Sequence, residues 1–384
     1  MTSFDKIIER RGTNSYKWDF GHNTRIKNLL PLWVADMDFE TPKGVIEAMK
    51  NRVNHGIYGY TFRPDSYYQS IISWFKEIHD IEIKKDWIVP IPGVVPGISF
   101  AIQAFTNPGD KIIIQPPVYR PFYEVITELG RRINLNPLIE KNGYYKMDFE
   151  NLEKIIDERT RMLILCSPHN PVGRVWKKEE LERLGEICIR KNIIIVSDEI
   201  HADIVYSPSK HNVLISVSEK LLDNTIILTA PNKTFNIAGL QSGNAFIPSK
   251  KLKDQFSAVI NSQHLSMSNI FGIVATEAAY KYGKTWLNSL LDYLYKNAEF
   301  VKSYLESKTN VKTQIPEGTF LMWLDFRNYN SKDDIHKKLL ENGLWLNEGK
   351  EFGKEGIGFE RMNIATSRKI IEKALKIIEK TVKK

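Results

Sequence analysis

Four short runs of apolar, β-branched residues in the middle of the chain most limit what it can fold into. They cover residues 111–115, 162–166, 193–197 and 225–229. A strand with one solvent-exposed face alternates apolar and polar residues, whereas a run that is apolar throughout is typical of a strand buried on both faces. Stretches with helical spacing, such as residues 178–191, separate the runs. The alternation predicts an α/β fold with a mainly parallel sheet sandwiched by helices.

The pattern changes near residue 285, which indicates a second structural unit. Residues 286–308 have the spacing of a long helix, and residues 320–326 read as a strand. A chain of 384 residues is also longer than one compact core usually accommodates. We therefore expect a large domain over residues 46–284 and a smaller α+β domain made of residues 1–45 and 285–384.

Composition excludes several classes of function. The net charge is +8, but the lysines are spread along amphipathic stretches and do not form the basic stripe of a nucleic-acid-binding protein. No apolar run is long enough to cross a bilayer, so we expect no membrane association. Two cysteines, Cys166 and Cys188, cannot build a disulfide framework, and the first residues do not resemble a secretory signal. These features predict a cytoplasmic protein.

Polar residues follow the predicted strands in an unusual combination. Asp198 and His201 come directly after one strand, an Asn-Pro turn lies within residues 167–173 after another, and a lysine lies within residues 230–239 after a third. Upstream, the glycine-containing residues 92–97 open a helix. Because ligands of parallel sheets bind at the carboxyl ends of the strands, we expect an acid, an amide, a lysine and a helix start to converge on one rim.

With this order of motifs the sequence resembles fold-type I enzymes of the aminotransferase class I/II superfamily, which use pyridoxal 5′-phosphate (PLP). Within that superfamily it is most similar to the MalY/PatB group of cystathionine β-lyases, along essentially the whole chain. The resemblance rests on residues 32–39, 58–60, 116–122, 170–173, 197–201, 232–236 and 359–363. It implies a PLP-dependent transferase fold of type I, with no metal ion in the site.

The resemblance assigns four residues to the cofactor ring. Lys233 would carry PLP as a Schiff base and later move the α-proton of the substrate. Asp198 would keep the ring nitrogen protonated, Asn170 would bind the phenolic oxygen, and Tyr119 would stack on the ring. Simpler roles exist for each: a solvated surface lysine, a helix N-cap, a turn residue and a core aromatic residue.

The phosphate group requires backbone donors at a helix N-terminus, and Gly93, Val94 and Val95 would supply them. The resemblance also implies that Tyr60 reaches the phosphate of a neighbouring subunit, and hence a homodimer with shared active sites. Asn232 occupies a position where a serine is common, so we expect its amide to replace that hydroxyl group.

Arg361 resembles the arginine that holds the substrate carboxylate in this superfamily, a task that suits a planar guanidinium group. The simpler reading is a surface ion pair with Glu360. His201 could bind the phenolic oxygen of the cofactor or pack at the sheet edge. The other residues expected near the substrate are Ala35, Tyr119 and Asn170.

The predicted activity is cleavage of cystathionine or another S-substituted L-cysteine by α,β-elimination, which yields a thiol, pyruvate and ammonia. An aminotransferase of the same class is the alternative, because both reactions need the same lysine, acid, amide and arginine. A PLP-binding regulatory protein is a third possibility. The sequence does not identify the S-substituent.

Overall fold

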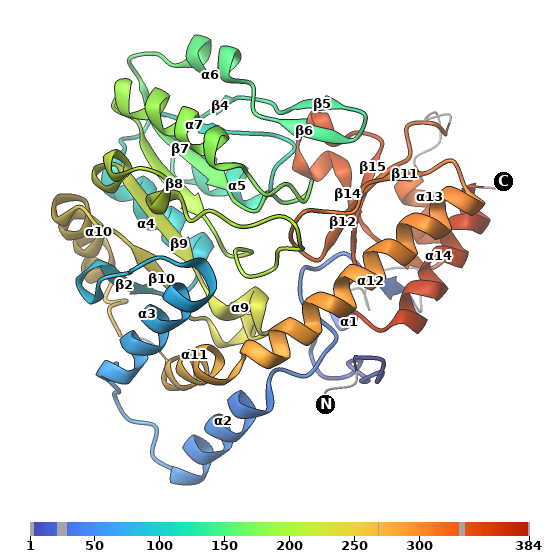
Figure 1. The fold of residues 1–384 in the computed structure, drawn as a ribbon, viewed down its shortest axis with the longest axis horizontal. Helices are drawn as coiled ribbons and strands as arrows, with labels where there is room; N and C mark the ends of the chain where they lie inside the picture. Colours follow the sequence, from blue (N-terminus) through green and yellow to red (C-terminus); the bar gives the residue numbers. More distant parts are fainter. Residues whose placement is uncertain (1–3, 21–28, 268, 330–334, 383–384) are drawn as a thin grey trace.

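The computed structural model describes residues 4–20, 29–267, 269–329 and 335–382. Figure 1 shows a large twisted sheet with helices packed on both faces, and beside it a smaller sheet covered by the last helices of the chain. The long helix α12 runs from the first unit into the second.

The large sheet has seven strands in the order β2-β10-β9-β8-β7-β3-β4. Only β10 runs antiparallel to its neighbours, so the predicted mainly parallel sheet is confirmed. The four apolar runs form four of its five inner strands, β3, β7, β8 and β9. In sheet order the strand bounds are Ile88–Ile91, Gly243–Phe246, Thr225–Thr229, Ile194–Asp198, Thr160–Cys166, Lys111–Ile114 and Arg132–Leu135.

Helices cover both faces of this sheet because its inner strands are apolar on both sides. In β7, Leu163 and Leu165 belong to one buried cluster, whereas Met162 and Ile164 belong to another. The first face is covered by α3 (Asp65–His79), α7 (Lys178–Arg190) and α11 (Ile270–Tyr282). The second is covered by α4 (Val94–Phe105), α5 (Pro121–Glu128) and α10 (Lys250–Ser262).

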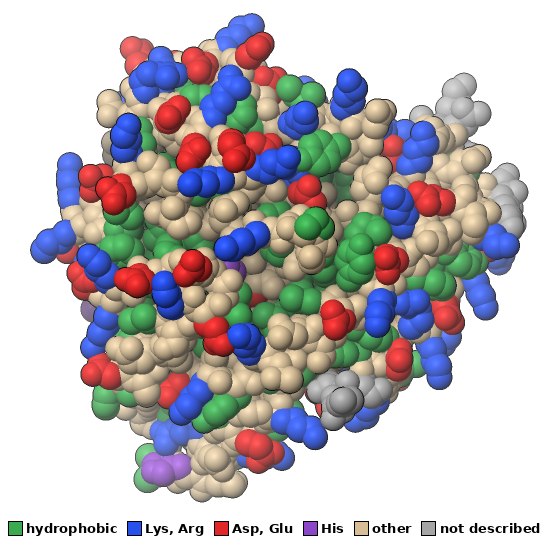
Figure 2. All heavy atoms as spheres, in the orientation of Figure 1, with side chains coloured by type: hydrophobic (Ala, Val, Ile, Leu, Met, Phe, Trp, Pro, Cys, Tyr) green, Lys and Arg blue, Asp and Glu red, His purple; other side chains and the backbone are tan. Residues whose placement is uncertain are grey.

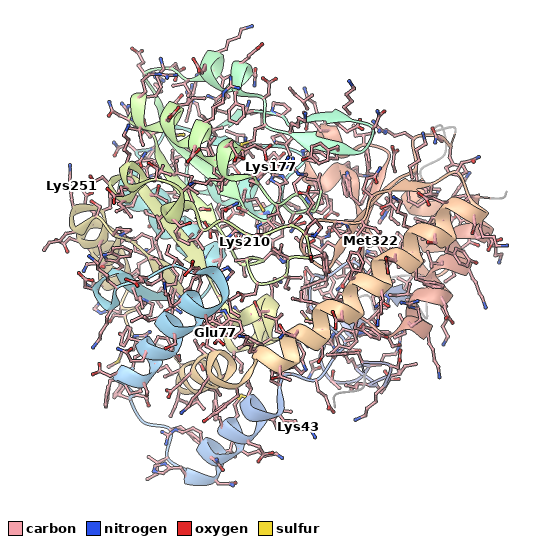
Figure 3. All side chains as sticks on the ribbon, viewed as in Figure 1. Lys43, Glu77, Lys177, Lys210, Lys251 and Met322 are labelled. Atoms are coloured by element: carbon pink, nitrogen blue, oxygen red, sulfur yellow. The ribbon has the colours of Figure 1, made fainter. Side chains whose placement is uncertain are left out.

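The smaller sheet is antiparallel, with strand order β11-β12-β15-β14. The bounds are Lys312–Thr313, Leu321–Asp325, Phe359–Asn363 and Asn347–Glu348. Helices α12 (Lys284–Lys308), α13 (Ile335–Glu341) and α14 (Arg368–Val382) accompany it. Met322, labelled in Figure 3, lies on β12 and is fully buried.

The N-terminal segment joins the C-terminal unit. Strand β1 (Leu30–Pro31) pairs in parallel with β13 (Leu344–Trp345). Between the two units, a hairpin of β5 (Ile139–Lys141) and β6 (Tyr144–Lys146) extends from the large sheet. The remaining helices are α1 (Tyr16–Asp19), α2 (Lys43–His55), α6 (Phe149–Ile155), α8 (Leu214–Val217) and α9 (Pro231–Thr234).

The surface is mixed in charge on the face drawn in Figure 2, where lysine and arginine side chains are interspersed with acidic ones. Within the described ranges, no helix is both long enough and apolar enough to span a bilayer.

Candidate active site

Lys233 lies in the short helix α9, which follows β9 at the carboxyl rim of the large sheet. Its side chain is partly buried, and Nζ donates to the carbonyl oxygen of Ala35 at 2.6 Å. Burial lowers the pKa of Lys233 to about 8; the nearby Arg361 charge also lowers it, whereas Asp36 and Asp198 oppose the shift. An amine in this environment gives up its proton more readily than a surface lysine does.

Asp198 is the last residue of β8, the strand next to β9. Its carboxylate is buried and accepts the backbone N–H of Ile200 at 3.1 Å, so it does cap a turn, but no helix begins there. Burial raises the pKa of Asp198 to about 7, despite the opposing influence of the Ile200 N–H and the Lys233 charge. A buried carboxylate of this kind favours a cationic group as its partner.

Arg361 lies on β15 and reaches across from the smaller sheet to the rim of the large one. Its guanidinium group is buried and donates to Oδ1 of Asn170 at 2.9 Å and to the Trp33 carbonyl at 2.7 Å. Burial lowers its pKa to about 10. The reading of Arg361 as a surface ion pair with Glu360 is wrong, because successive strand residues point to opposite faces and Glu360 contacts His336.

Three buried polar atoms of this region have no hydrogen-bond partner among the described residues: Nε of Arg361, Nδ1 of His201 and Oδ1 of Asn232. The His201 ring packs edge-to-face on Phe320, and burial lowers its pKa well below the usual value. Buried polar groups are nearly always paired in folded proteins. Unpaired ones grouped around Lys233 therefore indicate a site that binds a polar ligand.

Tyr119 is partly buried just before α5. Burial raises its pKa; the nearby Arg361 charge opposes this shift, and Asp198 contributes to it. The ring packs edge-to-face on Phe122, against the apolar cluster on the second face of the large sheet. Tyr119 therefore lies at the border of the core and is not fully enclosed by it.

Helix α4 begins at Val94, one residue after Gly93, on the same rim. No side chain caps its first N–H groups, Val94 is buried and Val95 is partly buried. A Cβ atom added to Gly93 would meet only Pro96, at 3.7 Å, so the space in front of this helix start is open. Free backbone N–H groups at the positive end of a helix dipole form a site for an anion.

Tyr60 lies outside this cluster. It belongs to the segment that follows α2, and its side chain is 96% exposed. Within one chain, contacts join Lys233 to Ala35 and Arg361 to Asn170, whereas the exposed Tyr60 lies away from them.

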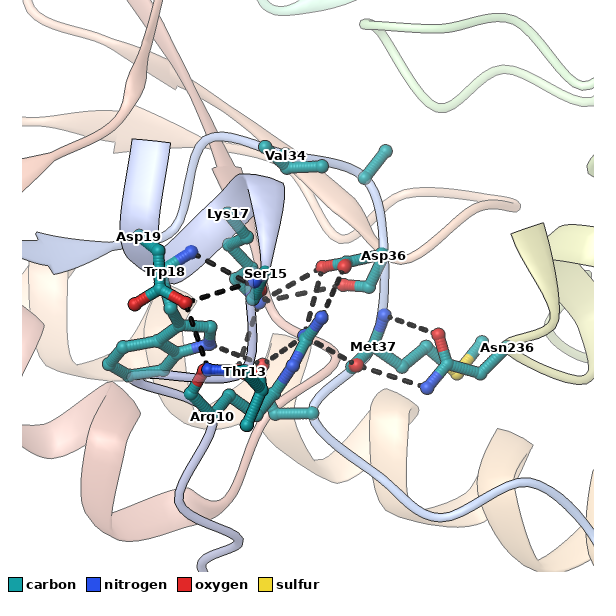
Figure 4. Close-up of polar contacts among 12 residues, drawn as sticks. Arg10, Thr13, Ser15, Lys17, Trp18, Asp19, Val34, Asp36, Met37 and Asn236 are labelled. Carbon is teal, nitrogen blue, oxygen red and sulfur yellow. Dashed lines mark hydrogen bonds and ion pairs between the residues drawn. The ribbon is translucent and has the colours of Figure 1, made fainter. Parts of the chain in front are cut away.

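A second, partly buried polar cluster that the sequence analysis did not predict lies next to Ala35 (Figure 4). Arg10 pairs with Asp36 at 2.7 Å and with Asp38 at 2.8 Å. Lys17 is buried and pairs with Asp38 at 2.9 Å. Asn236 donates to the Met37 carbonyl and accepts its N–H, both at 3.0 Å. The two aspartates of residues 32–39 were the available signal for this cluster.

Comparison with known proteins agrees with this geometry. The model of the family described as aminotransferase class I and II matches residues 27–378. The chain belongs to this family. It is similar to the cystathionine β-lyase PatB of Bacillus subtilis (strain 168), with 42% identity over 365 residues that cover 94% of each chain.

Two solved structures are also similar. Cystalysin from Treponema denticola, which contains a pyridoxal 5′-phosphate cofactor, has 38% identity and a TM-score of 0.95, with 100% of this chain and 99% of that chain covered. The PLP-bound C-S lyase from Staphylococcus hominis has 33% identity and a TM-score of 0.93, with 100% and 98% covered.

Proposed function

We propose that this protein is a PLP-dependent C–S β-lyase that cleaves cystathionine or another S-substituted L-cysteine into a thiol, pyruvate and ammonia. The observation that carries the proposal is the group of buried, incompletely paired polar atoms around Lys233. Its kinship with PatB, a cystathionine β-lyase, selects the lyase reaction among those that such a site can perform.

The site fits the cofactor in four respects. Lys233 would hold it covalently, and Asp198 would face the protonated ring nitrogen. The N–H groups at Gly93, Val94 and Val95 would receive the phosphate, and the side-chain amide N–H of Asn232 would donate to it. Asn170, Tyr119 and His201 would lie around the ring. When bound, PLP supplies an electron sink for the charge left at the substrate Cα.

Lys233 would act as the base that takes the Cα proton. A base works best when its pKa lies near the operating pH, and burial brings the pKa of Lys233 to about 8. The Ala35 carbonyl, 2.6 Å from Nζ, would receive the ammonium group that results. The same amine can then return its proton to the leaving thiolate, which requires no further acid.

Arg361 would bind the substrate carboxylate. Its Nε is buried and has no partner among the described residues. Asn170 and the Trp33 carbonyl hold the guanidinium plane in place, so that little freedom is lost when a carboxylate binds.

The test is to incubate the purified holoenzyme with L-cystathionine and with S-alkyl-L-cysteines, without any keto acid. We expect pyruvate and free thiol in equal amounts and over many turnovers. The Lys233→Ala variant should form neither product. Conversion of the cofactor to its amine form, reversed by a keto acid and without pyruvate, would instead establish the aminotransferase.

The proposed enzyme is a homodimer in which Tyr60 completes the site of the partner subunit. Support comes from the exposed apolar surface around it, since apolar patches of this kind are typical of interfaces. Its side chains are more than half exposed in the single chain: Ile57 66%, Tyr58 53%, Tyr60 96%, Phe62 81% and Met267 61%.

Complementation tests this arrangement. Co-expression of Lys233→Ala with Tyr60→Ala should give heterodimers in which one site carries both defects and the other carries none. Activity above that of either variant alone supports a contribution across the interface. If Tyr60 serves its own subunit, each site keeps one defect and no activity returns.

We also propose that residues 46–284 form the large domain and that residues 1–45 join residues 285–384 in the small one. The pairing of β1 with β13 supports this division. Two unpaired, buried cysteines support a cytoplasmic location.

A further inference from the structure

Asn363 is a fully buried residue of β15 that the proposed mechanism does not use. Its amide nitrogen donates to the carbonyls of Val34 and Asp36, both at 2.6 Å. Its amide oxygen accepts the backbone N–H of Ala365 at 2.7 Å. Both N–H groups of the side-chain amide therefore bind backbone carbonyls, those of the residues immediately before and after Ala35.

The carbonyl of Ala35 is the acceptor for Lys233. On one side of it, Arg361 holds the Trp33 carbonyl at 2.7 Å. The backbone N–H of Asn363 also holds the Leu32 carbonyl at 2.9 Å. Strand β15 thus fixes the carbonyls around Ala35, and the Ala35 carbonyl itself faces the amine of Lys233.

We propose that Asn363 is a positioning residue that keeps the Ala35 carbonyl against the Lys233 amine and thereby controls how readily Lys233 loses its proton. The inference rests on the proposed role of Lys233 as cofactor-bearing base. Asn363 touches neither Lys233 nor the reacting atoms, and acts only through the backbone that it holds.

Loss of the Asn363 amide frees the peptide that carries the Ala35 carbonyl. The ammonium form of Lys233 then loses its nearest acceptor, and a group that loses a partner for its charged form becomes more acidic. The charged or titratable groups that also act on Lys233 are Asp36, Asp198, Arg361 and His201. Of these groups only Asp36 lies on the segment that Asn363 holds, and it too raises the pKa of Lys233, so a fall in the titration midpoint of Lys233 reports on the position of the Ala35–Asp36 segment.

The variants are Asn363→Ala and Asn363→Leu, of which the second keeps the branched shape of the side chain without its hydrogen-bonding groups. Asn297 of α12 provides a matched control, since it is also fully buried in the same unit. Its amide nitrogen donates to the carbonyls of Ile364 and Thr366, both at 3.1 Å, and its oxygen accepts from Arg368. Asn297→Ala therefore removes the same kind of contacts without touching the Ala35 segment.

Two titrations give the answer. One follows kcat of the holoenzyme, whose acid-side midpoint reports the base. The other follows the labelling rate of Lys233 by trinitrobenzenesulfonate in the full-length chain after removal of the cofactor, read by peptide mass spectrometry. We expect both midpoints to fall by about half a pH unit or more in the Asn363 variants, the shift that a lost hydrogen bond of about 0.7 kcal/mol would cause.

Asn297→Ala should keep both midpoints of the original protein, even where its stability falls. Unchanged midpoints in a folded Asn363 variant, or the same shift in Asn297→Ala, would overturn the proposal. If Asn363→Ala does not fold, Asn363→Leu decides. The labelling titration needs no turnover, so it tests the effect of the Ala35 carbonyl on Lys233 even if the protein proves not to be a lyase.

Discussion

Two buried polar clusters lie side by side in this protein and differ in how their charges are paired. The lysine cluster, on the rim of the large sheet, comprises Lys233, Asp198, His201 and Arg361. The N-terminal ion cluster comprises Arg10, Lys17 and Asp36, which Figure 4 labels, and Asp38, which pairs with Arg10 and Lys17. Both remove charges from water, yet only the second has opposite charges in direct contact throughout.

The pKa shifts express this difference. Burial alone would raise the pKa of Asp38, but the charge of Lys17 and hydrogen bonds from Trp18, Lys17 and Arg10 outweigh it, and the pKa lies below the usual value. In the lysine cluster burial dominates, so the pKa of Asp198 rises and that of Lys233 falls. A fully paired cluster holds the fold together, whereas an incompletely paired one is prepared for a ligand that completes it.

The largest contrast is expected between two lysines. Lys233→Ala should reduce kcat by at least about a thousandfold, because it removes the covalent anchor and the base together. The free energy of unfolding of the cofactor-free variant should not fall, since the substitution removes a buried ammonium group that has no carboxylate in direct contact. Pyruvate release and urea unfolding measure the two effects. A clear loss of stability would mean that Lys233 has a structural role.

Lys17→Met, in contrast to Lys233→Ala, should lower the stability of the fold. It leaves the Asp38 carboxylate buried with fewer partners, and we expect a loss of about 3 to 5 kcal/mol in the free energy of unfolding. Lys43→Met, at an exposed position labelled in Figure 3, is the control and should change little.

The pH dependence of stability follows from the lowered pKa of Asp38. Its contribution is present above the carboxylate's unfolded pKa, near 4, and is lost as pH falls through the lower folded value. Urea unfolding between pH 5 and pH 2 should therefore show a steeper loss of stability in the original protein than in Lys17→Met. If stability fell equally with pH in both proteins, the ion pair with Lys17 would not be what lowers the pKa of Asp38.

Arg361→Lys should lower kcat/KM by about 10- to 100-fold, mainly through KM, because an ammonium group cannot make the paired contacts of a guanidinium with a carboxylate. Arg327→Lys is the control, since Arg327 is exposed and pairs with Asp325 on the same small unit. An equal effect of both substitutions would argue against a carboxylate site at Arg361.

The smallest effect concerns the cofactor-free protein. Because the folded pKa of Asp198 is raised to about 7 and its unfolded pKa is near 4, the fold loses stability as pH rises from about 4 to about 7, and the loss is complete above 7. Asp198→Asn should therefore stabilise the cofactor-free chain by about 1 to 2 kcal/mol at pH 8 and have little effect at pH 4. Thermal unfolding at both pH values measures this. Stabilisation at pH 4 alone would have the wrong sign.

Local pattern was sufficient to predict the large sheet and most of its rim. Strand β9 covers the predicted residues 225–229, and α4 begins at Val94, within the residues 92–97 that were predicted to open a helix. Buried parallel strands are apolar on both faces, so their positions can be read without knowing their neighbours. Because the residues after such strands share one edge, Asp198 and Lys233 could be placed together from the sequence.

Only the tertiary structure decided which groups are paired. Asn363 and Val34 lie 329 positions apart, and Arg361 and Asn170 lie 191 apart. Nor does any local pattern predict that Lys17, in a helix of four residues, is buried. The sequence determines which groups can ionise or donate, but their state depends on burial and on partners that only the folded chain brings into contact.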